Sequence, residues 1–285
     1  MRRRQRLWMR SAAVAAGVVL VALSGSPHPA AGSARSTSPV GSLTPRQALN
    51  RLGLRPLKDY TATPVVRVPF ESPREVEGWY ATPQTPLTHH ELSNEVVHNG
   101  KFAEKAWVTG ANVDDIEPDG PNHRGYPTMQ LYKRPRSCVT PCLISLWVWA
   151  DVTLQRGEWF QIATLTPAMS DVWLPSQLVN VGSEGWLHTW HVPTQGRSDW
   201  TYQRTNKPFP LRRWVNVKIL IDYRPSGGAI AAFQDGVLMS AAPIDGTVGD
   251  NGGGVLNQTH FGLYGPPTIR SGVIYNDKLT ISEVR

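Results

Sequence analysis

The stretch Leu143-Ile-Ser-Leu-Trp-Val-Trp-Ala-Asp-Val-Thr153 carries the clearest indication of the fold class. Successive side chains of a β-strand point to opposite faces, so the two parities of this stretch separate into two rows. One row is apolar and consists of Leu146, Val148, Ala150 and Val152. The other row holds Ser145, Trp147, Trp149, Asp151 and Thr153. The pattern predicts a strand with one face in a core and a second face that presents two tryptophans.

The same two-residue period recurs along most of the chain after residue 64, in segments bounded by Gly, Pro, Asn or Asp. Besides residues 143–153, the predicted strands are 128–133, 159–166, 185–192, 214–223, 229–234, 260–264 and 272–284. Asp235-Gly236 predicts a tight hairpin turn. No long amphipathic helix is predicted, and this many antiparallel strands need two sheets. The sequence therefore predicts an all-β sandwich over residues 65–285.

The N-terminal segment, residues 1–34, has the pattern of a signal peptide. Five arginines and no acidic residue precede the uncharged run 11–23, and Gly32-Ser33-Ala34 supplies small residues for cleavage after Ala34. The uncharged run is shorter than the about 20 apolar residues that a membrane-spanning helix needs. We therefore expect a secreted, extracellular protein with no membrane span after cleavage, and an uncleaved anchor is the alternative.

Residues 35–64 are rich in Ser, Thr, Pro and Gly and predict a spacer that is disordered or partly helical. The one helical signal covers residues 45–52, where Thr44 can act as N-cap and Pro45 as the first helical residue. Most of the net charge of +7 comes from the five N-terminal arginines. Because no basic cluster with interleaved aromatic residues remains after them, we expect no nucleic-acid partner. We also expect a monomer.

The two cysteines, Cys138 and Cys142, predict a disulfide that fixes the shape of a small loop in an exported chain. Two thiols alone make a poor zinc site. A turn-rich acidic run offers hard oxygen ligands of the kind that calcium prefers, and its members are Asp114, Asp115, Glu117 and Asp119. The run lacks the spacing of an EF-hand. We expect a solvated loop and no cofactor, with a structural calcium ion as the alternative.

Four segments of the C-terminal half carry a family resemblance. They read WVNVKILIDY (214–223), AAFQDG (231–236), HFGLYG (260–265) and GVIYNDKL (272–279). They resemble the closing strands of concanavalin A-like jelly rolls, in particular the polysaccharide lyases of that fold, such as alginate and glucuronan lyases. The resemblance covers residues 140–285 and implies a jelly-roll β-sandwich of two antiparallel sheets, with a polysaccharide as partner.

The resemblance also implies a site. Jelly-roll lyases place a Gln-Ile-His strand, an arginine strand and a tyrosine near the C-terminus across one sheet. The corresponding positions here are Gln161-Ile162 with Ala163 in place of the histidine, Tyr264 or Tyr275, and His123-Arg124 as a loose substitute for the arginine motif. The implied activity is β-elimination on an acidic glycan that contains uronic acid.

Elimination needs one group that neutralises the uronate carboxylate and others that move protons. Candidates for the carboxylate are Arg124, Gln130, Lys133 and Gln161. Candidates for proton transfer are His98, His123, His188, His191, Tyr264 and Tyr275, of which we predict His188, Tyr264, Tyr275 and His123 as catalytic. His188 is preferred to His191 because it shares strand parity with Trp186 and Trp190, while His191 points to the opposite face.

Other function classes stay open. A carbohydrate-binding module without catalysis would present tryptophans to sugar rings, and the candidates are Trp147, Trp149, Trp186 and Trp190. These tryptophans can equally fill a core layer or lie under loops. A glycoside hydrolase of the same fold needs two carboxyl groups at the scissile bond, but no Glu-x-Asp-x-Glu strand occurs. A structural envelope protein would leave His98, His123, His188 and Tyr264 far apart.

Overall fold

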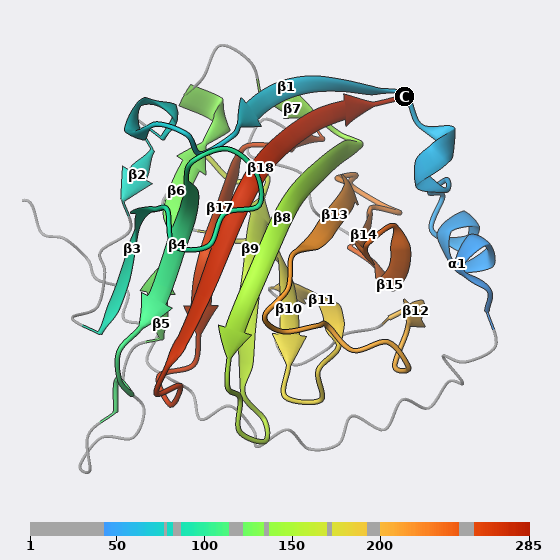
Figure 1. The fold of residues 1–285 in the computed structure, drawn as a ribbon. Coiled ribbons are helices and arrows are strands. Elements are labelled where there is room, and N and C mark those ends of the chain that lie inside the picture. The colour runs from blue at the N-terminus through green and yellow to red at the C-terminus, as the bar shows by residue number, and fades with distance from the viewer. Residues whose placement is uncertain are drawn as a thin grey trace, which may run out of the picture. The chain divides into compact units, whose positions relative to one another are not determined.

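The computed structural model describes residues 43–285 except 77–78, 82–86, 114–121, 134–136, 170–172, 193–199 and 245–253. The predicted signal segment and the acidic run 114–119 lie outside the described residues. Within them, two large antiparallel sheets form two layers, with the nine-stranded sheet nearer the viewer in Figure 1. This arrangement confirms the predicted all-β sandwich of two antiparallel sheets.

The nine-stranded sheet has the order β12-β15-β14-β13-β8-β18-β4-β3, and β1 pairs with β18. Its strands are β1 (Ala62–Val68), β3 (Thr88–Ser93), β4 (Ala103–Val108), β8 (Cys142–Val152), β12 (Tyr202–Gln203), β13 (Val215–Asp222), β14 (Ala229–Gln234), β15 (Val237–Pro243) and β18 (Gly272–Val284). The two longest strands, β8 and β18, are direct neighbours at its centre although residues 153–271 separate them in the chain.

The seven-stranded sheet has the order β11-β10-β9-β17-β6-β2, and β5 pairs with β17. Its strands are β2 (Tyr80–Ala81), β5 (His123–Gly125), β6 (Pro127–Gln130), β9 (Trp159–Thr166), β10 (Ser176–Gly182), β11 (Leu187–Val192) and β17 (Gln258–Gly265). A small third sheet pairs β7 (Cys138–Val139) with β16 (Val255–Leu256).

The core lies between the two large sheets and is filled by the apolar parity of each strand. In β8, buried and half-buried residues alternate along the whole strand, and Leu146, Val148, Ala150 and Val152 form its buried row. The prediction from this strand is confirmed, because burying one apolar row is what a half-exposed strand must do. The turn after β14 is confirmed as well, since Asp235 and Gly236 both have positive φ, as a tight hairpin turn requires.

Several predicted strand limits were wrong for local reasons. Residues 131–133 form the 3-10 helix η3 (Leu131–Lys133) and not the end of a strand, because the fully buried Leu131 turns into the core. Residue 185 does not begin β11, since Gly185 occupies the connection from β10 with φ of 82°. Ten strands of the described chain had no predicted range, namely β1, β2, β3, β4, β5, β7, β10, β12, β15 and β16.

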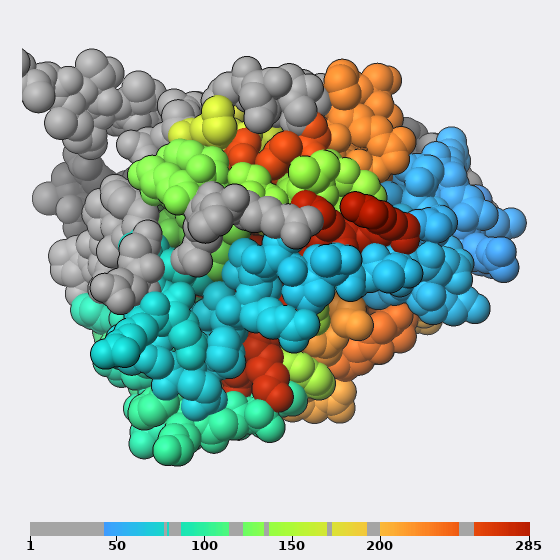
Figure 2. Space-filling view, turned by 90° about the horizontal axis from the view of Figure 1, so that it is seen from above, coloured from blue at the N-terminus to red at the C-terminus, as the bar shows by residue number. Residues whose placement is uncertain are grey.

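The described part of the expected spacer is packed against the nine-stranded sheet. Helix α1 (Pro45–Arg51) is held by the predicted cap, in which Thr44 Oγ1 accepts from Gln47 N and Gln47 reaches back to Thr44 N. Leu49 and Leu54 are buried with Leu238 of β15 in a second apolar cluster. Figure 2 shows this blue segment against the orange strands. Residues 43–61 therefore belong to the folded domain. Two short 3-10 helices flank β1 in the chain: η1 (Leu57–Asp59) precedes it and η2 (Pro73–Glu75) follows it.

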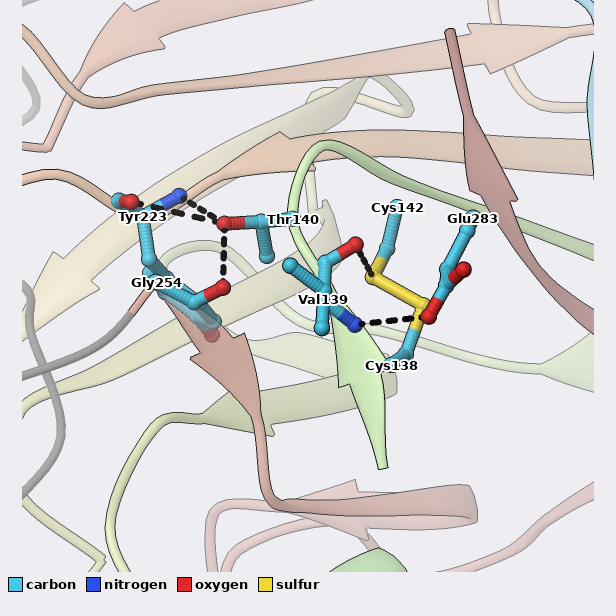
Figure 3. The surroundings of a disulfide bond; sticks show 7 residues. All are labelled: Cys138, Val139, Thr140, Cys142, Tyr223, Gly254 and Glu283. Carbon is cyan, nitrogen blue, oxygen red and sulfur yellow. Dashed lines mark hydrogen bonds between the residues drawn. A yellow bond between two sulfur atoms is a disulfide. The ribbon is translucent and has the colours of Figure 1, made fainter. Parts of the chain in front are cut away.

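The loop between β7 and β8 is fixed by the predicted disulfide, which joins Cys138 and Cys142. Figure 3 shows that this loop is tied to three other segments. Thr140 Oγ1 lies 2.9 Å from the Gly254 carbonyl and accepts from Tyr223 N, and Val139 N donates to a Glu283 carboxylate oxygen. The loop thereby anchors the start of β8. Across the described ranges, no helix is long and apolar enough to cross a membrane.

Candidate functional site

A row of polar side chains crosses the seven-stranded sheet. Cross-strand partners share a face of the sheet, and the register joins His188 to Asn180, Asn180 to Gln161, Gln161 to Tyr264 and Tyr264 to Arg124. We call these five residues the polar row. They come from β11, β10, β9, β17 and β5, so the row spans about 19 Å at the usual strand spacing.

The polar row faces away from the core. The residues that alternate with it along the strands are apolar and belong to the core cluster, and they are Leu187, Val181, Ile162 and Leu263. Ala163 is also in that cluster because β9 bulges against β10, which places two consecutive residues, Ile162 and Ala163, on the core side. The bulge leaves Gln161 and Thr164 on the outer face.

Two residues of the polar row have no side-chain hydrogen bond to the described chain. Gln161 is 1% exposed, yet neither its Oε1 nor its Nε2 has a partner, and the same holds for both ring nitrogens of His188, which is 6% exposed. In the described residues, no other side chain with two polar atoms leaves both buried and unpartnered. Asn180 Oδ1 adds a fifth such atom in the same row. Buried polar groups without partners cost free energy, so their concentration in one row indicates a site for a hydrogen-bonding ligand.

Tyr264 stands next to Gln161 in the row, and its hydroxyl group accepts a hydrogen bond of 2.8 Å from Asn122 Nδ2. Arg124 lies opposite Tyr264 on β5 and is exposed. An N–H donor and a nearby cation both stabilise negative charge on a phenol oxygen. The ring of Tyr264 is flanked by Trp159, with ring centroids 5.5 Å apart.

Tyr126 lies flat across this part of the sheet because Gly262 has no side chain. Gly262 has φ of 140°, and a Cβ there would lie 2.4 Å from the Gly125 carbonyl oxygen and 2.8 Å from Tyr126 Cβ. Tyr126 stacks on His260 at 3.6 Å and meets Tyr264 edge-on at 5.9 Å. The glycine therefore permits an aromatic cluster beside Gln161.

His260 belongs to the next row of the same face, where it pairs with Thr164 and Thr128. Burial, and to a smaller extent the charge of Arg124, lowers the pKa of His260 to about 3, so its imidazole is neutral near neutral pH. Trp173 packs edge-on against it at 5.3 Å. Sequence reasoning missed His260, although it shares strand parity with Tyr264 in the segment 260–264.

The other end of the row is formed by His188 with Glu184, which follows β10 in the connection to β11. His188 Nδ1 lies 3.6 Å from Glu184 Oε1, and this contact holds the pKa of Glu184 below its usual value. The ring of His188 is flanked by Trp200 at 5.8 Å and Trp190 at 6.3 Å. Sequence reasoning missed Glu184 and Asn180, because nothing local marks either residue as part of a site.

Two predicted catalytic residues lie elsewhere. His123 is fully buried, and both of its ring nitrogens are engaged, Nδ1 with Thr88 Oγ1 and Nε2 with the Ile269 carbonyl, each at 2.9 Å. Tyr275 is in the nine-stranded sheet and donates to Glu95 Oε2 at 2.7 Å. His98 is also remote from the row, stacked on Trp147 at 3.8 Å. His123 and Tyr275 are therefore withdrawn as catalytic candidates.

The predicted sugar-binding tryptophans are divided between the two sheets. Trp147 and Trp149 lie on the outer face of the nine-stranded sheet, where His98 covers Trp147 and Tyr275 packs against Trp149. Trp190 lies on β11 beside His188, and Trp186 just precedes that strand; both are half-buried. Trp190 therefore lies beside the polar row, whereas Trp147 and Trp149 pack against His98 and Tyr275 on the other sheet.

The remaining predicted ligand contacts are also divided. Gln130 is on β6, and its Nε2 lies 3.4 Å from Gln258 Oε1. Lys133 is exposed in η3, beside the ring of Tyr132. Among the residues with described positions, no group of three or more His, Cys, Asp or Glu side chains is arranged to hold a metal ion. The candidate calcium ligands in the acidic run lie outside the described residues.

Comparisons with solved structures agree with this architecture. Neither a family model nor a curated protein sequence matches the chain. The endo-β-1,4-glucuronan lyase from the fungus Trichoderma reesei superposes with a TM-score of 0.52 at 14% identity, covering 78% of this chain and 96% of that one. The cellulose-induced protein Cip1 gives a TM-score of 0.52 at 12% identity, covering 76% and 96%. The fold is the concanavalin A-like jelly roll. At these identities the likeness establishes the fold alone.

Proposed function

We propose that this protein is a secreted polysaccharide lyase that cleaves a uronic acid-containing glycan by β-elimination. The observation that carries the proposal is Gln161, a fully buried amide in the middle of the polar row with both polar atoms unpartnered in the described chain. A carboxylate and its neighbouring hydroxyl group are ligands that satisfy such an amide. The N-terminal signal pattern supports export, and the fold supports a long polymeric ligand across one sheet.

Gln161 and Asn180 are the groups that we assign to the uronate carboxylate. They are neighbours across β9 and β10, so their amides can donate to the two carboxylate oxygens. Donation to these oxygens stabilises the charge that develops on them when the C5 proton leaves. Neutral amides suit this task because their hydrogen bonds strengthen as the charge grows.

Tyr264 is the proton-transfer group that we assign. It adjoins Gln161 across a single strand spacing, about 4.8 Å, whereas His188 is two strands away on the other side. The phenolate of Tyr264 takes the C5 proton, the electron pair forms the C4–C5 double bond, and the C4–O bond breaks. The leaving oxygen then takes the proton from the Tyr264 phenol. Asn122 Nδ2 donates to the Tyr264 oxygen, and Arg124 is the cross-strand neighbour of Tyr264.

His260 is not assigned as the base, because its pKa of about 3 makes it a weak proton acceptor. Its neutral imidazole stacks under Tyr126 and keeps that ring in place beside the reacting sugar. This assignment differs from the expectation for His188. Proximity to the carboxylate-binding amide now decides between the two candidates.

Hydrolysis of the glycosidic bond is less well supported. A two-carboxylate mechanism needs a pair of acids about 5–10 Å apart across the scissile bond. The carboxylate that forms an ion pair with the polar row in the described residues is that of Glu184, and it lies at the end of the row. A binding module without catalysis makes the same contacts as a lyase but does not form an unsaturated product.

The test is to incubate the purified secreted protein with alginate, glucuronan, hyaluronan and heparin and follow the ultraviolet absorbance of the unsaturated uronate. We expect a rise with at least one glycan and none with Gln161→Glu, whose added charge opposes a carboxylate. Asn216→Asp is the matched control, since it places an acid on the other sheet, where Asn216 donates to Ser145. Retention of glycans without any rise in absorbance contradicts the lyase and leaves a binding module.

A further inference from the structure

The two ends of the polar row differ in charge. Arg124 provides a cation at the β5 end, next to Tyr264. Glu184 provides an anion at the β11 end, where its ion-pair partner in the described part of the chain is His188. Gln161 and Asn180 between them are neutral amides. A glycan that follows the row therefore meets a positive potential at one end and none at the other.

The position of the Glu184 carboxylate depends on a glycine at residue 182. Gly182 precedes it by two residues, and a Cβ on Gly182 would lie 2.4–2.7 Å from the Glu184 carboxylate atoms. Gly182 pairs with Trp159 at the end of β10, so the carboxylate occupies the space that a side chain of the sheet would otherwise fill. This placement brings the carboxylate to His188, while the Glu184 side chain stays 40% exposed.

Near neutral pH, the pair of Glu184 and His188 carries no net positive charge. The contact with His188 lowers the pKa of Glu184, so its carboxylate is ionised near neutral pH. With a neutral imidazole the pair has a charge of −1, and with an imidazolium its charge is zero. In neither state does it compensate the charge of a sugar carboxylate, whose approach to Glu184 is repulsive.

The groups around this pair suit an uncharged sugar. The rings of Trp190 and Trp200 flank His188, and both ring nitrogens of His188 lack a hydrogen-bond partner in the described chain. Aromatic side chains offer apolar faces to sugar rings, and an imidazole and a carboxylate exchange hydrogen bonds with hydroxyl groups. Such a subsite binds hydroxyl groups without needing a charge on the ligand.

We propose that Glu184 is a specificity-determining residue that makes the β11 end of the row a subsite for an uncharged sugar unit. The inference rests on the proposed function and narrows its substrate class. The preferred glycan contains a uronate held by Gln161 and Asn180 and an uncharged sugar one strand further along the row, at His188 and Glu184. A polymer composed of uronates alone places a carboxylate against Glu184 and binds more weakly.

Binding by calorimetry to the Tyr264→Phe variant tests this proposal without turnover. The probes are oligoglucuronate, which is charged at every unit, and hyaluronan oligosaccharides, in which glucuronate alternates with an uncharged N-acetylated sugar. We expect hyaluronan oligosaccharides to bind more tightly. Glu184→Gln is expected to strengthen oligoglucuronate binding about tenfold, equivalent to about 1.4 kcal/mol, and to leave hyaluronan binding unchanged.

Two comparisons make the result specific. Gly182→Ala, which displaces the Glu184 carboxylate, is expected to shift the preference in the same direction by a smaller factor. Glu91→Gln removes an exposed acid from β3 of the other sheet and is expected to change neither affinity. The gain in Glu184→Gln is expected to shrink as salt is raised, because screening weakens the repulsion in the parent variant.

Failure of this inference can be distinguished from failure of the proposed reaction. If the wild-type protein forms no unsaturated product but Glu184→Gln still shifts the preference, the specificity role stands and the lyase is wrong. Equal affinities for the two probes, or a Glu184→Gln variant with the wild-type preference, overturn the specificity role even if elimination occurs. Absence of binding to both probes overturns it as well.

Discussion

The outer faces of the two sheets carry similar residues but differ in how many of their polar side chains are hydrogen-bonded within the chain. On the nine-stranded sheet, Tyr275 and Lys105 both bond to Glu95, at 2.7 Å and 2.6 Å. Asp277 accepts from two backbone N–H groups through one oxygen, although its other oxygen is unpartnered in the described chain. On the seven-stranded sheet, no side-chain polar atom of Gln161 or His188 has a hydrogen-bond partner in that same part of the chain, although His188 Nδ1 lies 3.6 Å from Glu184.

Under the proposed function, this difference separates a packing face from a binding face. Aromatic and polar side chains occur together on both faces, so residue type does not identify the site. On the nine-stranded sheet, each side chain with a buried unpartnered atom has at most one such atom in the described chain, and His98 stacks on Trp147. On the seven-stranded sheet, Gln161 and His188 each have two buried polar atoms without a hydrogen-bond partner in the described chain. Because unmade buried bonds are costly, a fold retains them where a ligand completes them.

The largest expected effect compares two tyrosines, one on each face. Tyr264→Phe removes the proposed proton carrier and is expected to lower kcat by about 10²–10⁴-fold, the usual contribution of a positioned acid or base. Tyr275→Phe removes only a hydrogen bond to Glu95, so it is expected to keep activity and to lose about 1 kcal/mol of stability. Steady-state kinetics and denaturant unfolding of both variants measure the contrast. Equal losses of activity would break the distinction between the faces.

The next effect concerns a buried acid on the inner side of β4. Burial raises the pKa of Glu104 from 4.5 to about 8, while Asn276 donates to the carboxyl at 2.8 Å. His90 Nδ1 lies 4.0 Å away, but burial lowers its pKa, so the two groups are both neutral near pH 7 and form no ion pair.

Because the native state holds the Glu104 proton and the unfolded state releases it, stability falls as pH rises between about 5 and about 8. The expected slope is at most about 1.4 kcal/mol per pH unit. Urea unfolding as a function of pH measures the slope, and Glu104→Gln is expected to flatten it. An unchanged slope in that variant would assign the pH dependence to another group.

The smallest of the three effects compares two buried histidines. His123→Leu leaves Thr88 and the Ile269 carbonyl without their partner, and we expect a loss of about 1–3 kcal/mol in the free energy of unfolding. His188→Leu removes one contact of 3.6 Å to the 40% exposed Glu184 and no hydrogen bond to the described chain, so we expect little loss of stability but weaker glycan binding. Thermal unfolding and calorimetry with the same glycan separate the two. A strongly destabilised His188→Leu would indicate a structural histidine.

The sequence predicted the strands well where one parity was apolar, as in β8, and it predicted the Asp235-Gly236 turn and the disulfide. The sequence pattern did not predict which strands belong to which sheet. Gln161 and Tyr264 become neighbours only because β9 pairs with β17, which lies about a hundred residues later in the chain. Tyr275 has the same local signature as Tyr264 but belongs to the other sheet.

The missed site residues have a physical explanation too. His260 follows the parity of Tyr264, so the pattern could have identified it. Asn180 lies on a strand that was not predicted, and Glu184 lies in a connection where parity has no meaning. The role of Gly262 depends on the approach of Tyr126 from another strand, which no local pattern encodes.

The most direct test of the central claim is a titration of the ¹⁵N-labelled Tyr264→Phe protein with uronate oligosaccharides, observed through side-chain N–H signals. We predict that the amide signals of Gln161 and Asn180 and the indole signal of Trp190 shift in proportion to ligand bound, while the indole signals of Trp147 and Trp149 stay in place. Shifts confined to Trp147 and Trp149 would place the ligand on the nine-stranded sheet and contradict the account.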